Sequence, residues 1–168
     1  FGQTEVLLPA KVLLGVAARG AYTPLWSARI LEEWARAARK LGPGGEAQAR
    51  AEIAAVRAAW PGAEVDWPPS LEARLWLPDG NDIHVLAAAV AGSADVIVTV
   101  NAADFPRGLL AEEGLSRADP DAFLLGHWQG DPGGVAEVCD AVRSEAQRLS
   151  GDDWQIRALM KNCLLYTS

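Results

Sequence analysis

Two aspartates lie at positions where an α/β protein can bind a metal ion. Asp82 begins an alanine-rich helical segment, directly after the turn sequence Pro-Asp-Gly-Asn. Asp104 follows the apolar run 96–100, which predicts a buried strand of a parallel sheet. Because ligands of open α/β sheets bind at the carboxyl ends of the strands, we expect the two carboxylates to meet there around a hard cation that prefers oxygen ligands.

Each of these acids also has a simpler interpretation. An aspartate at a helix start often caps the helix, since its side chain accepts an orphan backbone N–H. Asp104, in the sequence Asn-Ala-Ala-Asp-Phe-Pro, can be an ordinary turn residue. Local sequence alone leaves both alternatives open, so the prediction depends on the elements around the two residues.

Three helices are predicted before Asp82: one over residues 10–19, one capped by Ser27, and one stopped by Pro61-Gly62. Apolar residues at helical spacing give the second and third helices one buried side each, and we expect the two to form a hairpin. These residues are Ile30, Leu31, Trp34, Ala38 and Leu41, then Ala49, Ile53, Val56 and Trp60.

Further elements are predicted after Asp104. We expect a short helix over residues 107–113, an edge strand over 115–117, and a helix starting at 119–120. An apolar stripe predicts another helix, and we expect residues 151–162 to form a final amphipathic one. The stripe consists of Val135, Val138, Val142 and Leu149.

Four motifs, in this order, resemble the PIN domain, the fold of the VapC-type toxin ribonucleases. They are residues 24–34, 81–89, 97–106 and 119–124, and the resemblance covers about residues 6–126. It implies an α/β fold, a three-layer α/β/α sandwich with a mostly parallel central sheet, followed by C-terminal helices. We therefore expect a PIN-like domain over residues 1–126 and a helical extension over residues 127–162.

The resemblance also implies a chemistry. PIN domains cut RNA, usually single-stranded, with carboxylates that hold one or two Mg²⁺ or Mn²⁺ ions, which neutralise the phosphate and activate water. Carried over by position, the catalytic metal ligands here are Glu33, Asp82 and Asp104. Asn101 stands where many relatives have another acid and can offer a carbonyl oxygen without charge. Two hydroxyl residues would orient the ligands from outside, Thr99 and Ser27.

Glu33 competes with Glu32 for the ligand position on the second helix. The two side chains point about 100° apart, and both the buried side of the helix and the family spacing from Ser27 favour Glu33. His84, two residues into an apolar helix, is expected to be a packed or rim histidine and not a general base.

The start of the chain departs from the family pattern. A PIN domain begins with a short apolar strand that ends in an Asp, and if residues 6–9 match the segment after it, Gln3 stands in its place. Glu5 fits that register poorly, so the first ligand stays open.

The chain begins with Phe, and its last six residues, 163–168, match the translated end of a sequencing-library adapter. We expect an amino-terminally truncated chain with an adapter-derived end.

The net charge of −7 is unusual for a protein that binds nucleic acid. RNA binding would have to be local, and arginines on the predicted hairpin could form a basic rim beside the acids. The candidates are Arg29, Arg36 and Arg39. The alternative is that these residues are only the solvated faces of helices in an arginine-rich sequence.

Composition predicts one cytoplasmic domain of ordinary size. The 168 residues are half apolar, with no apolar run long enough to span a membrane and no signal peptide at the observed start. Cys139 is expected to fill the core, because the adapter-derived Cys163 leaves it as a lone cysteine. Expected partners are an RNA substrate, an antitoxin protein and a second copy of the chain. Trp34 and Trp60 could anchor a protein contact or belong to the core.

Two functions of different classes follow. The first is a metal-dependent endoribonuclease of the PIN toxin type. The second is a catalytically weak or inactive PIN scaffold that binds protein or RNA, which the absent first Asp and Asn101 favour. An unrelated nucleotide-binding α/β domain is disfavoured, because no glycine-rich phosphate loop follows a predicted strand.

Overall fold

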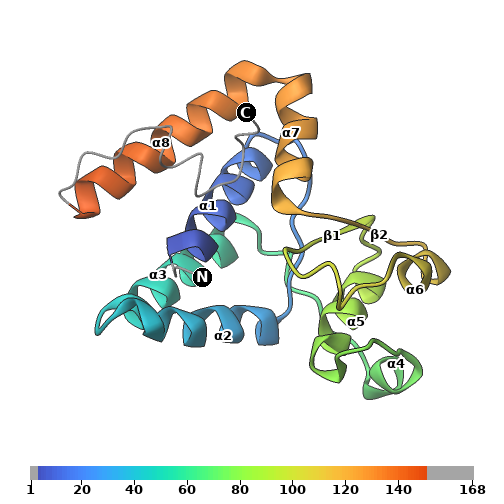
Figure 1. Cartoon of the computed structure of the whole chain (residues 1–168). Helices are drawn as coiled ribbons and strands as arrows, with labels where there is room; N and C mark the ends of the chain where they lie inside the picture. The colour runs from blue at the N-terminus through green and yellow to red at the C-terminus, as the bar shows by residue number, and fades with distance from the viewer. Residues whose placement is uncertain (1–3, 151–168) are drawn as a thin grey trace. The chain divides into compact units, whose positions relative to one another are not determined.

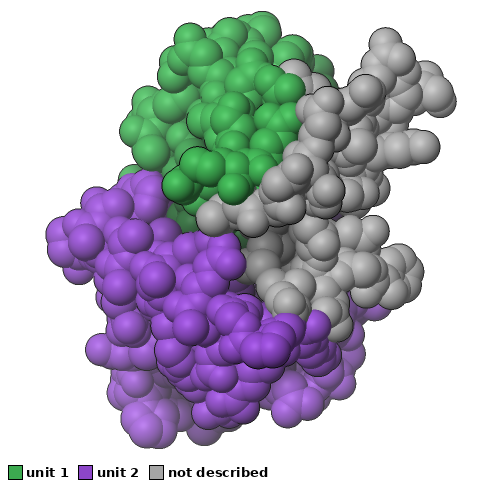
Figure 2. All heavy atoms as spheres, turned by 90° about the vertical axis from the view of Figure 1, so that its left-hand side faces the viewer, with its two compact units in different colours: residues 1–23, 120–168 green, residues 24–119 purple. Residues whose placement is uncertain are grey.

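The computed structural model describes residues 4–150 (Figure 1). The chain divides into two compact units, residues 24–119 and the two flanking segments 1–23 and 120–168, coloured separately in Figure 2. The predicted helix over residues 151–162 and the residue Gln3 lie outside the described part. Every other candidate site residue except Glu5 belongs to the unit of residues 24–119.

The flanking unit is helical. It contains α1 (Thr4–Ala18), α7 (Pro120–Gly130) and α8 (Pro132–Ser150), which confirms the helix predicted to start at 119–120 and the helix predicted from the stripe of Val135 to Leu149. The helix predicted over residues 10–19 starts at Thr4, so that prediction was wrong at its start: Pro9 costs one backbone hydrogen bond, and the helix runs through it. Cys139 is 6% exposed in the core of this unit, as predicted. That core comprises Val12, Val16, Leu124, Val135, Val138, Cys139 and Val142.

The central unit begins with the predicted helical hairpin, formed by α2 (Ala28–Ala37), the 3₁₀ turn η1 (Ala38–Leu41) and α3 (Gly45–Ala59). The Ser27 hydroxyl accepts the Ile30 N–H at 3.2 Å, which confirms the predicted cap. Arg50 of α3 ties the two helices together through Glu32, at 3.0 and 3.2 Å. Trp34 and Trp60 are half-buried.

The predicted parallel pairing is present. Strands β1 (Val96–Val98) and β2 (Ser116–Ala118) pair in parallel, with α6 (Arg107–Glu112) in the connection, as parallel neighbours require (Figure 1). A second parallel bridge joins Trp26 to Glu64, at the two ends of the helical hairpin. The chain therefore has the α/β fold that the sequence predicts, with a small parallel sheet in its described part.

The strand boundaries differ slightly from the prediction. β1 ends at Val98 and not at Val100, because the Thr99 hydroxyl accepts the Asn101 N–H at 3.0 Å and turns the chain out of the sheet. Val100 is consequently 76% exposed. β2 starts at Ser116, one residue later than the predicted 115–117, since Leu115 is bonded back to Leu110 in the preceding turn.

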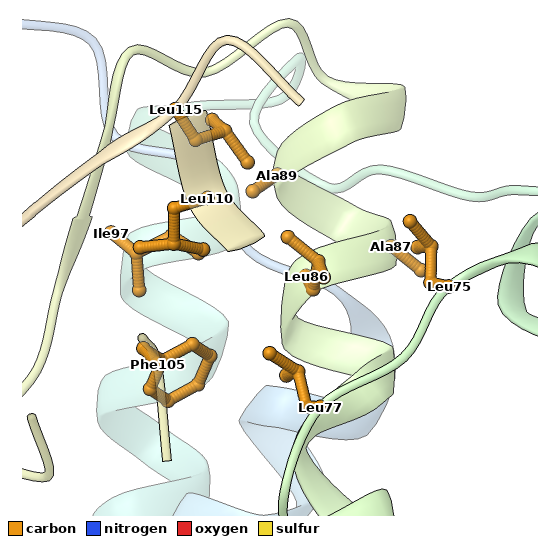
Figure 3. Packing of buried hydrophobic residues seen from close by; sticks show 9 residues of the cluster. All are labelled: Leu75, Leu77, Leu86, Ala87, Ala89, Ile97, Phe105, Leu110 and Leu115. Carbon is orange, nitrogen blue, oxygen red and sulfur yellow. The ribbon is translucent and has the colours of Figure 1, made fainter. Parts of the chain in front are cut away.

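The core of the central unit holds the helix that carries Asp82. This helix, α5 (Ile83–Ala91), follows α4 (Pro69–Arg74) and the short 3₁₀ turn η2 (Gly80–Asp82). Figure 3 shows side chains of α5 packed against the β1–α6–β2 segment and against the chain that leads into η2. The cluster comprises Leu75, Leu77, Leu86, Ala87, Ala89, Ile97, Phe105, Leu110 and Leu115. Leu77 and Phe105 are both buried in this cluster, which therefore positions Asp79, two residues after Leu77, and Asp104, directly before Phe105.

Among residues 4–150, no helix combines the length and the apolar character that a membrane span requires.

Candidate metal centre

Three aspartates of the central unit converge on one point. Carboxylate oxygens of Asp79, Asp82 and Asp104 all lie within 4.8 Å of one another. Asp79 and Asp82 come from η2, at the amino end of α5, and Asp104 comes from the loop after β1. The predicted meeting of Asp82 and Asp104 is therefore observed, and Asp79 joins them.

Asp79 is positioned by the turn that it begins. It caps η2, and its Oδ1 atom accepts both the backbone N–H of Asn81 at 2.9 Å and the Asn81 side-chain amide at 3.0 Å. Both bonds use the same carboxylate oxygen. The turn thus fixes the direction of this carboxylate toward Asp82, three residues further on.

Asp82 is not used as a helix cap. It occupies the cap position of α5, but its side chain makes no capping hydrogen bond. Burial raises the pKa of its carboxyl group, and the negative charges of Asp104 and Asp79 raise it further, opposed by His84. A carboxylate that stabilises no helix and is destabilised by its neighbours is not explained by folding alone.

Asp104 is held by the turn that follows β1. Its side chain accepts a hydrogen bond from the Asn101 amide nitrogen, and its backbone N–H donates to the Asn101 carbonyl at 3.3 Å. The Asn101 N–H in turn donates to the Thr99 hydroxyl. Asn101 thus offers its side-chain amide nitrogen to Asp104 and holds this carboxylate in place.

Glu33 lies outside the group of three aspartates. Its Oε1 atom accepts a hydrogen bond from Arg29 Nε at 3.0 Å, and its Oε2 atom lies 3.3 Å from His84 Nε2. The His84 side chain is 1% exposed, as the prediction of a packed histidine implies. Burial lowers the pKa of His84, against the raising effect of the Glu33 charge. The Glu33 carboxylate therefore contacts Arg29 and His84, and His84 is two residues after Asp82.

The arginines of the predicted basic rim are all ion-paired. Arg29 pairs with Glu33, Arg36 with Glu32, and Arg39 with Glu46. Exposed pairs of this kind contribute little to stability, but each neutralises the local charge that would attract a phosphate. Ser27, a predicted orienting residue, is 3% exposed and caps α2.

The three aspartates fit a divalent cation. Carboxylate oxygens are the ligands that Mg²⁺ and Mn²⁺ prefer, and a cation would relieve the repulsion that, in addition to burial, raises the pKa of Asp82. Asp82 and Asp104 are half-buried, so they keep access to solvent and to a ligand. The group can hold a divalent cation.

Sequence reasoning identified two of the three acids and missed Asp79. The signal was present, since Asp79 and Asp82 stand three residues apart around a Gly-Asn turn that opens a helix, a spacing that brings side chains to one side. The proposed roles of Gln3 and Glu5 cannot be placed, because Gln3 and the Glu5 side chain lie outside the described residues.

Comparison with protein families gives one match. The family model of the PIN domain matches residues 5–103, which is more than half of the 168 residues. The matched segment contains two of the three aspartates, Asp79 and Asp82, and Asp104 is the residue directly after it. No curated protein matches the chain, and no solved structure matches it.

Proposed function

Because this chain belongs to the PIN-domain family, whose members are usually nucleases, we propose that it is a metal-dependent endoribonuclease of the toxin type. The observation that carries the proposal is the convergence of Asp79, Asp82 and Asp104 within 4.8 Å at the carboxyl end of β1. The reaction is hydrolysis of an RNA phosphodiester bond.

The three aspartates would hold Mg²⁺ or Mn²⁺. When bound, such an ion neutralises the phosphate, lowers the pKa of a bound water and stabilises the leaving oxygen. The chain's own residues supply the geometry: the η2 turn aims Asp79, and Asn101 fixes Asp104. Asp82 accepts no cap bond and stays available as a ligand.

Two exposed apolar side chains on the segments that carry the acids support single-stranded RNA as the substrate. Trp76 is 64% exposed between the buried Leu75 and Leu77, three residues before Asp79. Val100 is 76% exposed beside Asn101. Unpaired bases stack on aromatic side chains, whereas paired bases cannot reach them. Since the arginines of α2 are ion-paired, stacking on Trp76 would contribute more to RNA binding than they do.

We extend the proposal to partners of the toxin type, an antitoxin protein and a second copy of the chain. Large half-buried side chains on the helical hairpin support such contacts, because Trp34 and Trp60 combine an apolar ring with partial access to solvent.

A second function has its own support. Asn101 stands in place of an acid, and Glu33 is occupied by Arg29 and His84, so the metal site has fewer free carboxylates than a complete PIN site would. A catalytically weak or inactive scaffold that binds protein or RNA is consistent with this.

A cleavage assay separates the two functions. The full chain is incubated with end-labelled single-stranded RNA in Mn²⁺ or in EDTA. We expect cleavage in Mn²⁺ alone, loss of cleavage in Asp104→Asn, and unchanged cleavage in the matched control Asp66→Asn, which lies outside the acid group. Cleavage by Asp104→Asn at the wild-type rate would refute the site, and RNA binding without cleavage by the wild type would favour the scaffold.

A further inference from the structure

Two side chains of α2 reach the turn that carries the acids. Arg29 and Glu33 are four residues apart, so they lie on the same side of the helix. Arg29 Nη2 donates to the backbone carbonyl of Asn81 at 3.4 Å, and Glu33 Oε2 lies 3.3 Å from His84 Nε2. The two contacted residues flank Asp82 on both sides.

One ring nitrogen of the buried His84, Nε2, faces the Glu33 carboxylate. Within the described residues, His84 Nδ1 is buried without a hydrogen-bond partner, whereas Nε2 faces the Glu33 carboxylate. In a neutral ring one nitrogen carries the proton and the other accepts, so the proton belongs on Nε2, where it has an acceptor. The Glu33 carboxylate therefore lies between the two side chains: its Oε1 atom accepts from Arg29 Nε, and its Oε2 atom lies 3.3 Å from His84 Nε2.

We propose that Arg29 and Glu33 form a clamp that fixes the turn of residues 79–84, and that Glu33 acts on Asp82 as a positioning residue through His84 and is not a metal ligand. The inference rests on the proposed metal site for its functional meaning, but the clamp itself is a contact within the chain. A Glu33 carboxylate that turned to a cation would have to leave both Arg29 and the buried imidazole.

A pair of substitutions at one position separates positioning from ligation. Glu33→Gln keeps an oxygen that can face His84 Nε2 but has no charge for a cation, and Glu33→Ala has neither. A positioning role predicts that Glu33→Gln behaves like the wild type, whereas a ligand role predicts that both variants fail alike. Glu32→Gln, one residue earlier on the same helix, is the matched control.

The first measurement is backbone amide exchange of residues 79–84 in metal-free protein. We expect Glu33→Ala to speed exchange about fivefold or more, as the loss of one polar side-chain contact allows, and Glu33→Gln and Glu32→Gln to change it less than twofold. Arg29→Ala, an exposed substitution, should speed the same segment. If residues 79–84 exchange at the wild-type rate in both Glu33→Ala and Arg29→Ala, the clamp is overturned.

The second measurement is Mn²⁺ affinity by calorimetry on the same proteins. We expect Glu33→Ala to bind about 10-fold more weakly, which is the usual loss when a residue behind the ligands is removed, and Glu33→Gln to stay within about threefold of the wild type. Equal losses in both variants would overturn the positioning role and make Glu33 a ligand. Absence of Mn²⁺ binding by the wild type would refute the metal site, and the exchange result would still decide the clamp.

Discussion

Replacing Asp82 by asparagine should stabilise the metal-free protein while it destroys the metal site. Its oxygens lie within 4.8 Å of those of Asp79 and Asp104. Two unit charges about 4 Å apart repel by about 1 kcal/mol in water and about 4 kcal/mol at an effective dielectric constant of 20. Because Asp82 is only half-buried, we take the lower value for each of its two neighbours. Asp82→Asn should therefore raise the free energy of unfolding by about 1–2 kcal/mol at low salt.

The pH dependence of this gain has a definite sign. The folded-state pKa of Asp82 is raised above its ordinary value of 3.8, so the folded protein takes up this proton before the unfolded chain does. The penalty is fully present above the raised pKa and is lost as the pH falls through it toward 3.8. The advantage of Asp82→Asn should accordingly be largest near neutral pH and vanish in acid.

Urea denaturation in EDTA and in Mn²⁺ tests this prediction, with Asp66→Asn as the control for loss of one charge. In Mn²⁺ the order should reverse, because an ion at 100 times its dissociation constant stabilises the wild type by about 2.7 kcal/mol and cannot do so in Asp82→Asn. The reasoning is refuted if Asp82→Asn is less stable than the wild type in EDTA at neutral pH, or if its advantage persists unchanged in acid.

Three further predictions each concern one position. Asp79→Asn keeps a side-chain oxygen that can accept the turn hydrogen bond but loses the negative charge, so the protein should stay folded. Calorimetry should show its Mn²⁺ affinity reduced about 10-fold or more, and an unchanged affinity would exclude Asp79 from the site. In fluorescence anisotropy, Trp76→Ala should weaken binding of single-stranded RNA about 5- to 100-fold, and Trp76→Phe should keep most of the wild-type affinity. Equal affinity in the wild type and both variants would exclude stacking on Trp76. Gly92→Ala should cost about 1–3 kcal/mol in urea denaturation. Its added Cβ would lie 3.1 Å from the backbone carbonyl oxygen of Ala88 and 2.8 Å from the Leu25 side chain. The control Gly62→Ala should cost less, because its Cβ would have open space around it.

Periodicity was sufficient to predict the elements that surround the site. The helical hairpin, the Ser27 cap and the parallel pairing depend on local patterns, apolar spacing and an N-cap residue, and the structure confirms them. The end of β1 was wrong by two residues, because an apolar run continues through Val100 while the Thr99 hydroxyl has already turned the backbone away. Side-chain hydrogen bonds to the backbone compete with the pattern and are not visible in it.

The site was only partly predictable for a related reason. Asp82 and Asp104 follow from topology, since a helix start and a strand end meet at one edge of a sheet. Asp79 in a Pro-Asp-Gly-Asn sequence has a sufficient explanation as a turn residue, so its three-residue spacing from Asp82 was not used, and the folded η2 turn places its carboxylate beside Asp82. The contact of Glu33 with His84 joins residues 51 positions apart, which no local pattern contains.

The most direct test of the metal centre is a Mn²⁺ titration of the full chain followed by electron paramagnetic resonance, in which free Mn²⁺ is counted. The account predicts saturable binding by the wild type and by Asp66→Asn, and its loss in Asp82→Asn. Binding by Asp82→Asn equal to that of the wild type, or no binding by the wild type at all, would contradict the assignment of Asp79, Asp82 and Asp104 as a divalent metal site.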